Sequence, residues 1–294
     1  MTIMRTVVFT LAALLTLRGA QAQSLLGNSF DGVLYDVDIA TGAATNPRST
    51  GTGVNSLTGI TFGPSGTLYG LTTFAGTPGN SLVTIDPVTG SSTSIGFTGL
   101  VVAEGDLAFD PISGVLFGMQ HVPIDRQLFT MNVATGAGTV VGSLGGTETI
   151  EPSAMTFAPD GTLYILDTGS ILGDGTKLPT RLLTVDKSNA ATLTSITLPV
   201  NLGFTAGMDF HPATGTLYVA DGGLGDGTDS LYSIDPTNGA MALVGPTGVV
   251  GGMAGLVFAI PEPSSAAMAS IAGLIALAMR RNLTLSIPSP SAPA

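Results

Sequence analysis

An internal repeat of 46 to 54 residues constrains the fold of this 294-residue chain more than any other feature of its sequence. One motif joins a phenylalanine, a turn and a Leu-Tyr or Leu-Phe pair, and its copies begin at Phe62, Phe109, Phe157 and Phe210. A second motif alternates with it. It has leucine, then aspartate or asparagine four positions later, then usually glycine, with copies at Leu34, Leu82, Leu128 and Leu231 and a worn copy at Leu182. Such a period indicates an array of equal structural units.

Each motif predicts a β-hairpin. Proline fixes φ at the turn, glycine accepts left-handed conformations, and aspartate accepts backbone N–H groups. Two hairpins supply four strands, which is the content of one propeller blade. Residues 82–85 and 182–185 are more continuously apolar than a sheet with one wet face allows, as expected for sheets covered on both faces. The 41 glycines and 18 prolines interrupt the chain too often for helices in this region.

The two ends of the repeat region complement each other. Residues 253–258 carry an inner-strand motif without its second hairpin, and residues 24–50 carry a second hairpin without an inner strand. We therefore expect one composite blade, made from residues 252–260 and 24–48, beside four continuous blades. The predicted fold is an all-β propeller of five four-stranded blades, closed by pairing of its N- and C-terminal strands, which hides two sheet edges. The alternatives are an open stack of sheets and a larger ring completed by a second chain.

Composition excludes several classes of protein. A hydrophobic content of 44% is enough for a sizeable core. The net charge of −11 would repel a phosphate backbone, which excludes nucleic acid as an expected partner. The chain contains no cysteine, so disulfide frameworks and thiol nucleophiles are excluded too.

The N-terminus has the pattern of a secretory signal peptide, residues 1–22. Arg5 supplies the positive charge, residues 7–17 are apolar, and Ala20-Gln21-Ala22 forms a cleavage site before Gln23. We therefore expect signal peptidase to act on the chain and the mature protein to leave the cytoplasm.

The C-terminus has three features in order. Pro261, Glu262 and Pro263 are followed by an apolar segment at 264–279 and then by Arg280 and Arg281. A helix over 264–279 would be about 24 Å long, which is short for a bilayer core of about 30 Å. It could span with the arginines at the cytoplasmic surface and the body outside.

This tail resembles the PEP-CTERM sorting signal of exported bacterial proteins. The resemblance implies transient anchoring in the inner membrane and cleavage near Pro261–Pro263 by an exosortase-type enzyme, followed by display at the cell surface or release. Residues 282–294, rich in proline and serine, extend beyond the usual end of such a tail and are expected to be disordered. The alternative is a plain C-terminal anchor helix. The predicted organisation is thus signal peptide 1–22, propeller 23–260, sorting tail 261–281 and extension 282–294.

Propellers generally bind ligands at the central channel, where four carboxylates are expected: Glu104, Asp106, Glu151 and Asp209. Such a cluster could bind a cation or act as acid and base if neighbouring charges raised one pKa. The alternative is that acids fall near one another by chance in an acidic protein. His121 is expected on an inter-strand loop, and His211 as an exposed turn residue.

Two matching glycine-rich loops follow Leu-Tyr strands and contain Leu-Gly-Asp-Gly-Thr. Their carboxylates suit a calcium ion, and the predicted ligands are Asp167, Asp174, Asp221, Asp226 and Asp229. Neither loop has EF-hand spacing, and Asp-Gly is also an ordinary turn pair, so a cofactor-free turn is the alternative reading.

The repeats also resemble bacterial extracytoplasmic propellers of the YVTN and NHL type, which implies a blade and not a chemistry. No nucleophile elbow, Walker loop or H-E-x-x-H motif is present. We expect an exported surface or matrix protein that acts as a binding or structural scaffold, with exopolysaccharide or another surface protein as partner. The alternative is a calcium-dependent hydrolase or lactonase of the propeller type.

Overall fold

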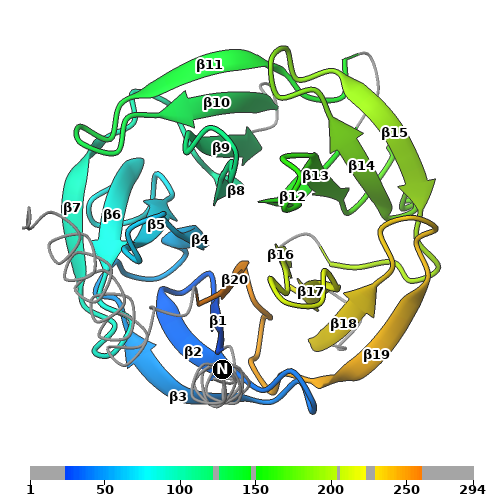
Figure 1. The fold of residues 1–294 in the computed structure, drawn as a ribbon, viewed down its shortest axis with the longest axis horizontal. Coiled ribbons are helices and arrows are strands. Elements are labelled where there is room, and N and C mark those ends of the chain that lie inside the picture. Colours follow the sequence, from blue (N-terminus) through cyan, green and yellow to red (C-terminus); the bar gives the residue numbers. More distant parts are fainter. Residues whose placement is uncertain (1–23, 122–125, 147–149, 204–205, 223–228, 260–294) are drawn as a thin grey trace, which may run out of the picture. The chain divides into compact units, whose positions relative to one another are not determined.

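The computed structural model describes residues 24–121, 126–146, 150–203, 206–222 and 229–259. These residues belong to one compact unit, residues 22–260. Twenty strands in the described ranges form five antiparallel sheets of four strands, arranged around a common axis (Figure 1). The predicted all-β propeller with five four-stranded blades is confirmed.

The blades are numbered here in chain order, and their strands run from the axis outward. They are β20 (Gly255–Phe258), β1 (Leu25–Asn28), β2 (Val33–Val37) and β3 (Ala44–Ser49) in blade 1; β4 (Leu57–Phe62), β5 (Leu68–Thr72), β6 (Ser81–Ile85) and β7 (Ser92–Phe97) in blade 2; β8 (Glu104–Phe109), β9 (Leu116–His121), β10 (Gln127–Met131) and β11 (Gly138–Ser143) in blade 3; β12 (Pro152–Phe157), β13 (Leu163–Asp167), β14 (Arg181–Val185) and β15 (Thr192–Thr197) in blade 4; and β16 (Ala206–Phe210), β17 (Leu217–Asp221), β18 (Ser230–Ile234) and β19 (Met241–Pro246) in blade 5.

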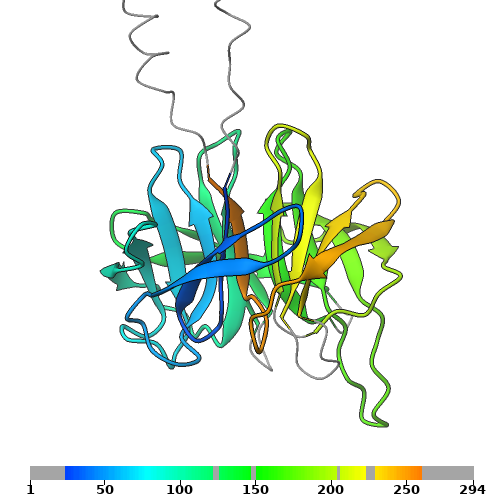
Figure 2. The same ribbon diagram turned by 90° about the horizontal axis from the view of Figure 1, so that it is seen from below.

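Blade 1 is the composite blade that closes the ring. Its inner strand β20 pairs antiparallel with β1, with Leu25 opposite Phe258 and Leu26 opposite Val257. Figure 2 shows the two strands side by side, β1 in blue and β20 in orange. Since β20 also packs against β4 and β16, the inner strands form a closed circle within one chain, rather than the open stack or two-chain ring that the sequence left open.

The two ends of the ring differ in their connections. Hairpins join the first to the second strand and the third to the fourth at one end, which we call the turn face. At the other end, the loop face, the second strand connects to the third and each blade to the next. The described chain begins and ends at the turn face, where the Ala259 N–H donates to the Ser24 carbonyl at 2.8 Å.

The hairpins of the second motif are stabilised by their aspartate. Asp86 Oδ1 accepts the N–H groups of Val88 and Thr89 at 2.8 and 3.1 Å, and Asp38, Asn132, Asp186 and Asp235 accept equivalent bonds. Gly90 then adopts a φ of +82°, a conformation that costs glycine little. The worn copy keeps this geometry with Ala190 at +65°.

The aromatic residues of the first motif explain why it recurs. In four of the five inner strands, the phenylalanine packs on the Leu-Tyr or Leu-Phe ring of the preceding blade, with centroids 5.4 to 5.6 Å apart. The pairs are Tyr69–Phe109, Phe117–Phe157, Tyr164–Phe210 and Tyr218–Phe258. At the fifth junction, between blades 1 and 2, Phe62 packs instead in a cluster with Leu26 and Val257. Each aromatic pair adds about 0.5–1.5 kcal/mol beyond its buried area.

Candidate functional site

Two of the four predicted channel carboxylates take part in a ring of hydrogen bonds between blades. Asp106 Oδ2 in blade 3 accepts the Met155 N–H of blade 4 at 2.9 Å. Asp209 in blade 5 accepts the Thr156 hydroxyl of blade 4 at 2.8 Å and the Phe258 N–H of blade 1 at 2.7 Å. These bonds link three successive junctions.

The remaining two junctions carry bonds of the same kind. The Asn28 amide of blade 1 donates to the Leu57 carbonyl of blade 2 at 3.0 Å. The Thr58 hydroxyl of blade 2 donates to the Gly105 carbonyl of blade 3 and accepts its N–H, both at 2.7 Å. A side chain therefore bonds across each of the five junctions near the axis.

Neighbouring inner strands approach one another closely at the level of their glycines. A Cβ atom on Gly255 would lie 3.0 Å from the Gly59 Cα, and one on Gly207 would overlap the Gly255 backbone. Asp106 is 2% exposed, and burial raises its pKa well above the ordinary value. Burial likewise raises the pKa of Asp209 to about 6. Asp106 is therefore buried in the ring and Asp209 is partly buried there, and the oxygens of both bond to neighbouring strands.

The other two carboxylates meet on the loop face, between blades 3 and 4. His121 ends β9, instead of lying on a loop, and its Nε2 is 2.5 Å from Glu151 Oε2 while its Nδ1 is 3.7 Å from Glu104 Oε2. Arg126 Nη2 lies 3.2 Å from Glu151 Oε1, and the Ser170 hydroxyl donates to the same Glu151 oxygen at 2.6 Å. We call this group the His121 cluster.

The His121 cluster holds its charges fixed. Burial alone would lower the pKa of His121, but hydrogen bonds and charge from Glu104 and Glu151 outweigh it and raise the pKa to about 9. Burial would raise the pKa of Glu151, but its bonds to His121 and Ser170 lower it to about 2. At neutral pH His121 is therefore an imidazolium that can donate hydrogen bonds but cannot act as a general base.

The cluster predicts a pH-dependent stabilisation. His121 contributes fully below its unfolded pKa of 6.5, and the contribution is lost as pH rises through about 9; the contribution of Glu151 is lost as pH falls from 4.5 towards 2. Replacing His121 with glutamine should therefore lower the free energy of unfolding by about 1–3 kcal/mol at pH 5–6 and by much less above pH 9. Urea unfolding across this range measures the effect. A cycle with Glu151→Gln should show coupling that disappears at high pH; a pH-independent difference would contradict the assignment.

The predicted calcium ligands lie in several separate environments. Asp167 is buried, pairs with Arg181 at 2.7 Å and accepts the Glu151 N–H at 2.8 Å, and Asp221 is buried and accepts the Gly203 N–H at 2.7 Å. Asp174 is exposed and caps its own turn through Thr176.

The last two predicted ligands are Asp229, whose carbonyl accepts the Thr247 N–H at 2.8 Å, and Asp226, which lies outside the described residues. Within the described ranges no group of three His, Asp or Glu side chains is placed to hold a metal ion. Calcium binding stays a prediction.

The predicted sorting residues Pro261, Glu262, Pro263, Arg280 and Arg281 lie outside the described residues, as do residues 1–22, the apolar segment 264–279 and the extension 282–294. In the described part of the chain, no helix has the length and apolar character needed to cross a membrane.

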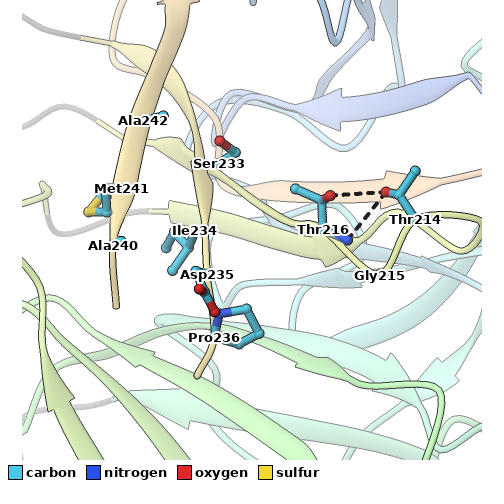
Figure 3. A pocket seen from close by; sticks show the side chains of 10 residues that line it. All are labelled: Thr214, Gly215, Thr216, Ser233, Ile234, Asp235, Pro236, Ala240, Met241 and Ala242. Carbon is cyan, nitrogen blue, oxygen red and sulfur yellow. Dashed lines mark hydrogen bonds between the residues drawn. The ribbon is translucent and has the colours of Figure 1, made fainter. Parts of the chain in front are cut away.

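A shallow hollow of about 420 Å³ lies on the turn face of blade 5, lined by residues 214–216, 233–236 and 240–242 (Figure 3). The Thr214 and Thr216 hydroxyls bond to each other at 3.0 Å, and Asp235 bonds to its own turn. The hollow contains none of the predicted site residues.

The sequence did not reveal that the four predicted carboxylates form two groups, one bonded across the blade junctions and one in the His121 cluster. Glu104 and Glu151 precede the inner-strand phenylalanines of neighbouring blades by five and six residues, which was a signal that they could meet. Nothing in the sequence identified Arg126 or Ser170 as their partners. Asp167 and Asp221 lie four residues after the leucine that begins the second strand of their blades. Thr72 and Gln120 occupy the same position in blades 2 and 3 and are also buried and polar, so a buried polar residue here is a structural feature of the blade.

Comparison with known proteins adds a family. The model of a family described as a repeat of unknown function, DUF6923, matches residues 106–273, more than half of the chain. The chain belongs to this family. The matched segment of the DUF6923 chain begins in β8 and runs past β20. Among curated proteins, none matches this chain.

Solved structures resemble the DUF6923 chain in fold. A chain of the nidogen/laminin complex is 14% identical with a TM-score of 0.51, and the match covers 81% of this chain and 99% of that one. A chain from a study of the de novo evolutionary emergence of a symmetrical protein is 22% identical with a TM-score of 0.49, and the match covers 82% and 100%. TolB from Acinetobacter baumannii is 13% identical with a TM-score of 0.43, covering 77% and 53%. The nidogen/laminin match supports the propeller fold and nothing further.

Proposed function

We propose that this protein is an exported propeller scaffold, sorted by an exosortase-type enzyme and displayed at the cell surface or released, where it binds exopolysaccharide or another surface protein. Signal peptidase removes residues 1–22, and the apolar segment 264–279 holds the chain in the inner membrane until the tail is cut.

One observation carries the proposal. The last strand, β20, ends at Phe258, and Pro261-Glu262-Pro263 follows within three residues. Cleavage at or beyond this motif removes no strand of the propeller, so the processed body keeps its closed ring. The first and last described residues, Ser24 and Ala259, are bonded to each other at the turn face.

Processing can be tested in cells that make the full chain with and without an exosortase-type enzyme. Mass spectrometry of the exported protein should show loss of residues beyond the Pro-Glu-Pro motif only when the enzyme is present. Replacing Pro261, Glu262 and Pro263 together with alanine should reduce the processed form at least tenfold and leave the protein in the inner membrane.

Gly173→Ala, on an exposed loop of the propeller, is the matched control and should be processed normally. The same mature C-terminus without the enzyme, or a chain that keeps Met1 and stays in the cytoplasm, would reject the proposal.

A further inference from the structure

Four large apolar side chains are exposed at the loop face around blade 2. Phe74 follows β5 and Phe97 ends β7, and they are 62% and 61% exposed; Val54 and Val101, on the loops before β4 and β8, are 69% and 57% exposed. No other phenylalanine in the described ranges is exposed. Apolar side chains gathered in this way on a soluble domain mark an interaction surface.

Asn80 joins three of the segments that carry these side chains. Its N–H donates to the Thr73 carbonyl at 2.8 Å, next to Phe74, and its carbonyl accepts the Thr98 N–H at 2.8 Å, next to Phe97. Its side-chain Oδ1 accepts the Val102 N–H at 2.7 Å, next to Val101. Asn80 adopts a φ of +48°, a conformation that non-glycine residues seldom take without a local reason.

The fourth segment is attached by Thr73. The Thr73 hydroxyl donates to the Asn55 carbonyl at 2.6 Å, next to Val54, and the Thr73 N–H donates to the Ser56 carbonyl at 2.9 Å. The Phe74 N–H also bonds directly to the Val102 carbonyl at 2.7 Å. We call Val54, Phe74, Phe97 and Val101, held by these bonds, the Asn80 platform. Because its backbone is already fixed, a partner pays little ordering entropy when it binds.

The charges beside the platform are acidic. Asp31 Oδ1 accepts the Asn55 N–H at 3.1 Å, so a carboxylate lies next to Val54. Glu104 follows Val101 by three residues, but its carboxylate already faces His121 at 3.7 Å. All lysines and arginines in the described ranges already contact a carboxylate or a carbonyl: Arg48, Arg126, Lys177, Arg181 and Lys187. The edge of the platform therefore attracts positive charge and repels negative charge.

We propose that the Asn80 platform is a docking site for a protein segment in which apolar side chains are flanked by lysine or arginine. The apolar residues cover Phe74 and Phe97, and a basic residue faces Asp31. A second copy of this chain would bring like charges together, and an anionic lipid surface would be repelled by the Asp31 carboxylate. This inference does not depend on the export route proposed above.

The test uses the protein as its producing cells make it and a synthetic peptide in which leucine and phenylalanine alternate with lysine. A second peptide carries glutamate in place of lysine. Biolayer interferometry should show binding of the lysine peptide, at least tenfold weaker binding to the Phe74→Ser, Phe97→Ser double variant, and no binding of the glutamate peptide. Asp31→Asn should weaken binding severalfold and reduce its dependence on salt.

Leu193→Ser is the matched control, because Leu193 is 64% exposed on β15, away from the platform. It should bind the peptide as the wild type does, and circular dichroism should show that all variants keep the fold. Equal affinity of the wild type and the double phenylalanine variant would overturn the proposal, as would equal binding of both peptides. Self-association in sedimentation that depends on Phe74 and Phe97, without peptide binding, would overturn it too.

Discussion

Replacing Gly207 with alanine is expected to lower the free energy of unfolding by about 3 kcal/mol, because the added methyl has no room between the inner strands β16 and β20. A Cβ at this position overlaps the backbone of Gly255 and the Leu256 nitrogen in the next inner strand. A flexible side chain could rotate away from such a clash, whereas a backbone can only shift. Urea unfolding followed by circular dichroism measures the change.

The matched control is Gly173→Ala. Gly173 has open space around its Cα and ordinary backbone dihedrals, so its substitution should change stability by no more than about 0.5 kcal/mol. The difference between the two variants isolates the steric effect from the general effect of replacing glycine. Similar destabilisation by both would show that the inner strands can separate without cost.

The closed ring explains why this effect should be large. A shift of β16 away from β20 strains the bond between Asp209 and the Phe258 N–H and the contact between Tyr218 and Phe258. In an open stack, the end sheet could move freely. In a ring, the displacement has to be shared among the other junctions, each of which has its own hydrogen bond and apolar contacts.

The fold could be predicted because its information is local and repeated. A turn sequence such as Phe62 to Leu68 specifies its own hairpin, and four approximate copies of it make an accidental match improbable. The composite blade that closes the ring could be predicted because the inner strand missing from residues 24–50 appears at residues 253–258. Pairing of Leu25 with Phe258 satisfies both fragments and leaves neither edge open.

The candidate site could not be predicted to the same degree, because its contacts are neither local nor repeated. The five junctions use asparagine, threonine and aspartate in different combinations, so no common signal marks them. Asp106 and Asp209 were predicted as channel carboxylates because the sequence places them on inner strands, and the sequence does not show that their oxygens bond to the neighbouring strand. The glycines at 59, 207 and 255 were the available clue, since three of five inner strands have glycine three residues before their phenylalanine.

Replacing Asp209 is expected to have the second large effect, with a characteristic dependence on pH. Asp209→Ala removes the acceptor of the Phe258 and Phe210 N–H groups and of the Thr156 hydroxyl. A buried donor left without a partner costs about 1–3 kcal/mol, so the variant should lose at least that amount. Asp209→Asn keeps one acceptor oxygen and removes the charge, so it separates the lost bonds from the titration.

The sign of the pH effect follows from the direction of the pKa shift. Burial raises the folded pKa of Asp209 from 3.8 to about 6, so the folded state holds a proton that the unfolded state has released between these values. The contribution of Asp209 to stability therefore falls as pH rises from about 4 to 6, by at most about 3 kcal/mol. The free energy of unfolding that Asp209→Asn loses relative to the wild type should be largest near pH 4 and should shrink towards pH 7.

An exposed turn aspartate provides the comparison that makes this test decisive. Hydrogen bonds from Thr89 and Val88 lower the pKa of Asp86, so its stabilisation is present above its unfolded pKa and is lost as pH falls. Asp86→Asn should therefore lose the most free energy of unfolding at neutral pH and less in acid, which is opposite to the behaviour of Asp209→Asn. Difference curves of the same sign for both variants would mean that the carboxylate of Asp209 is not held in the packed ring. Opposite signs would identify Asp209 as an acid that closes two blade junctions most firmly when it is protonated.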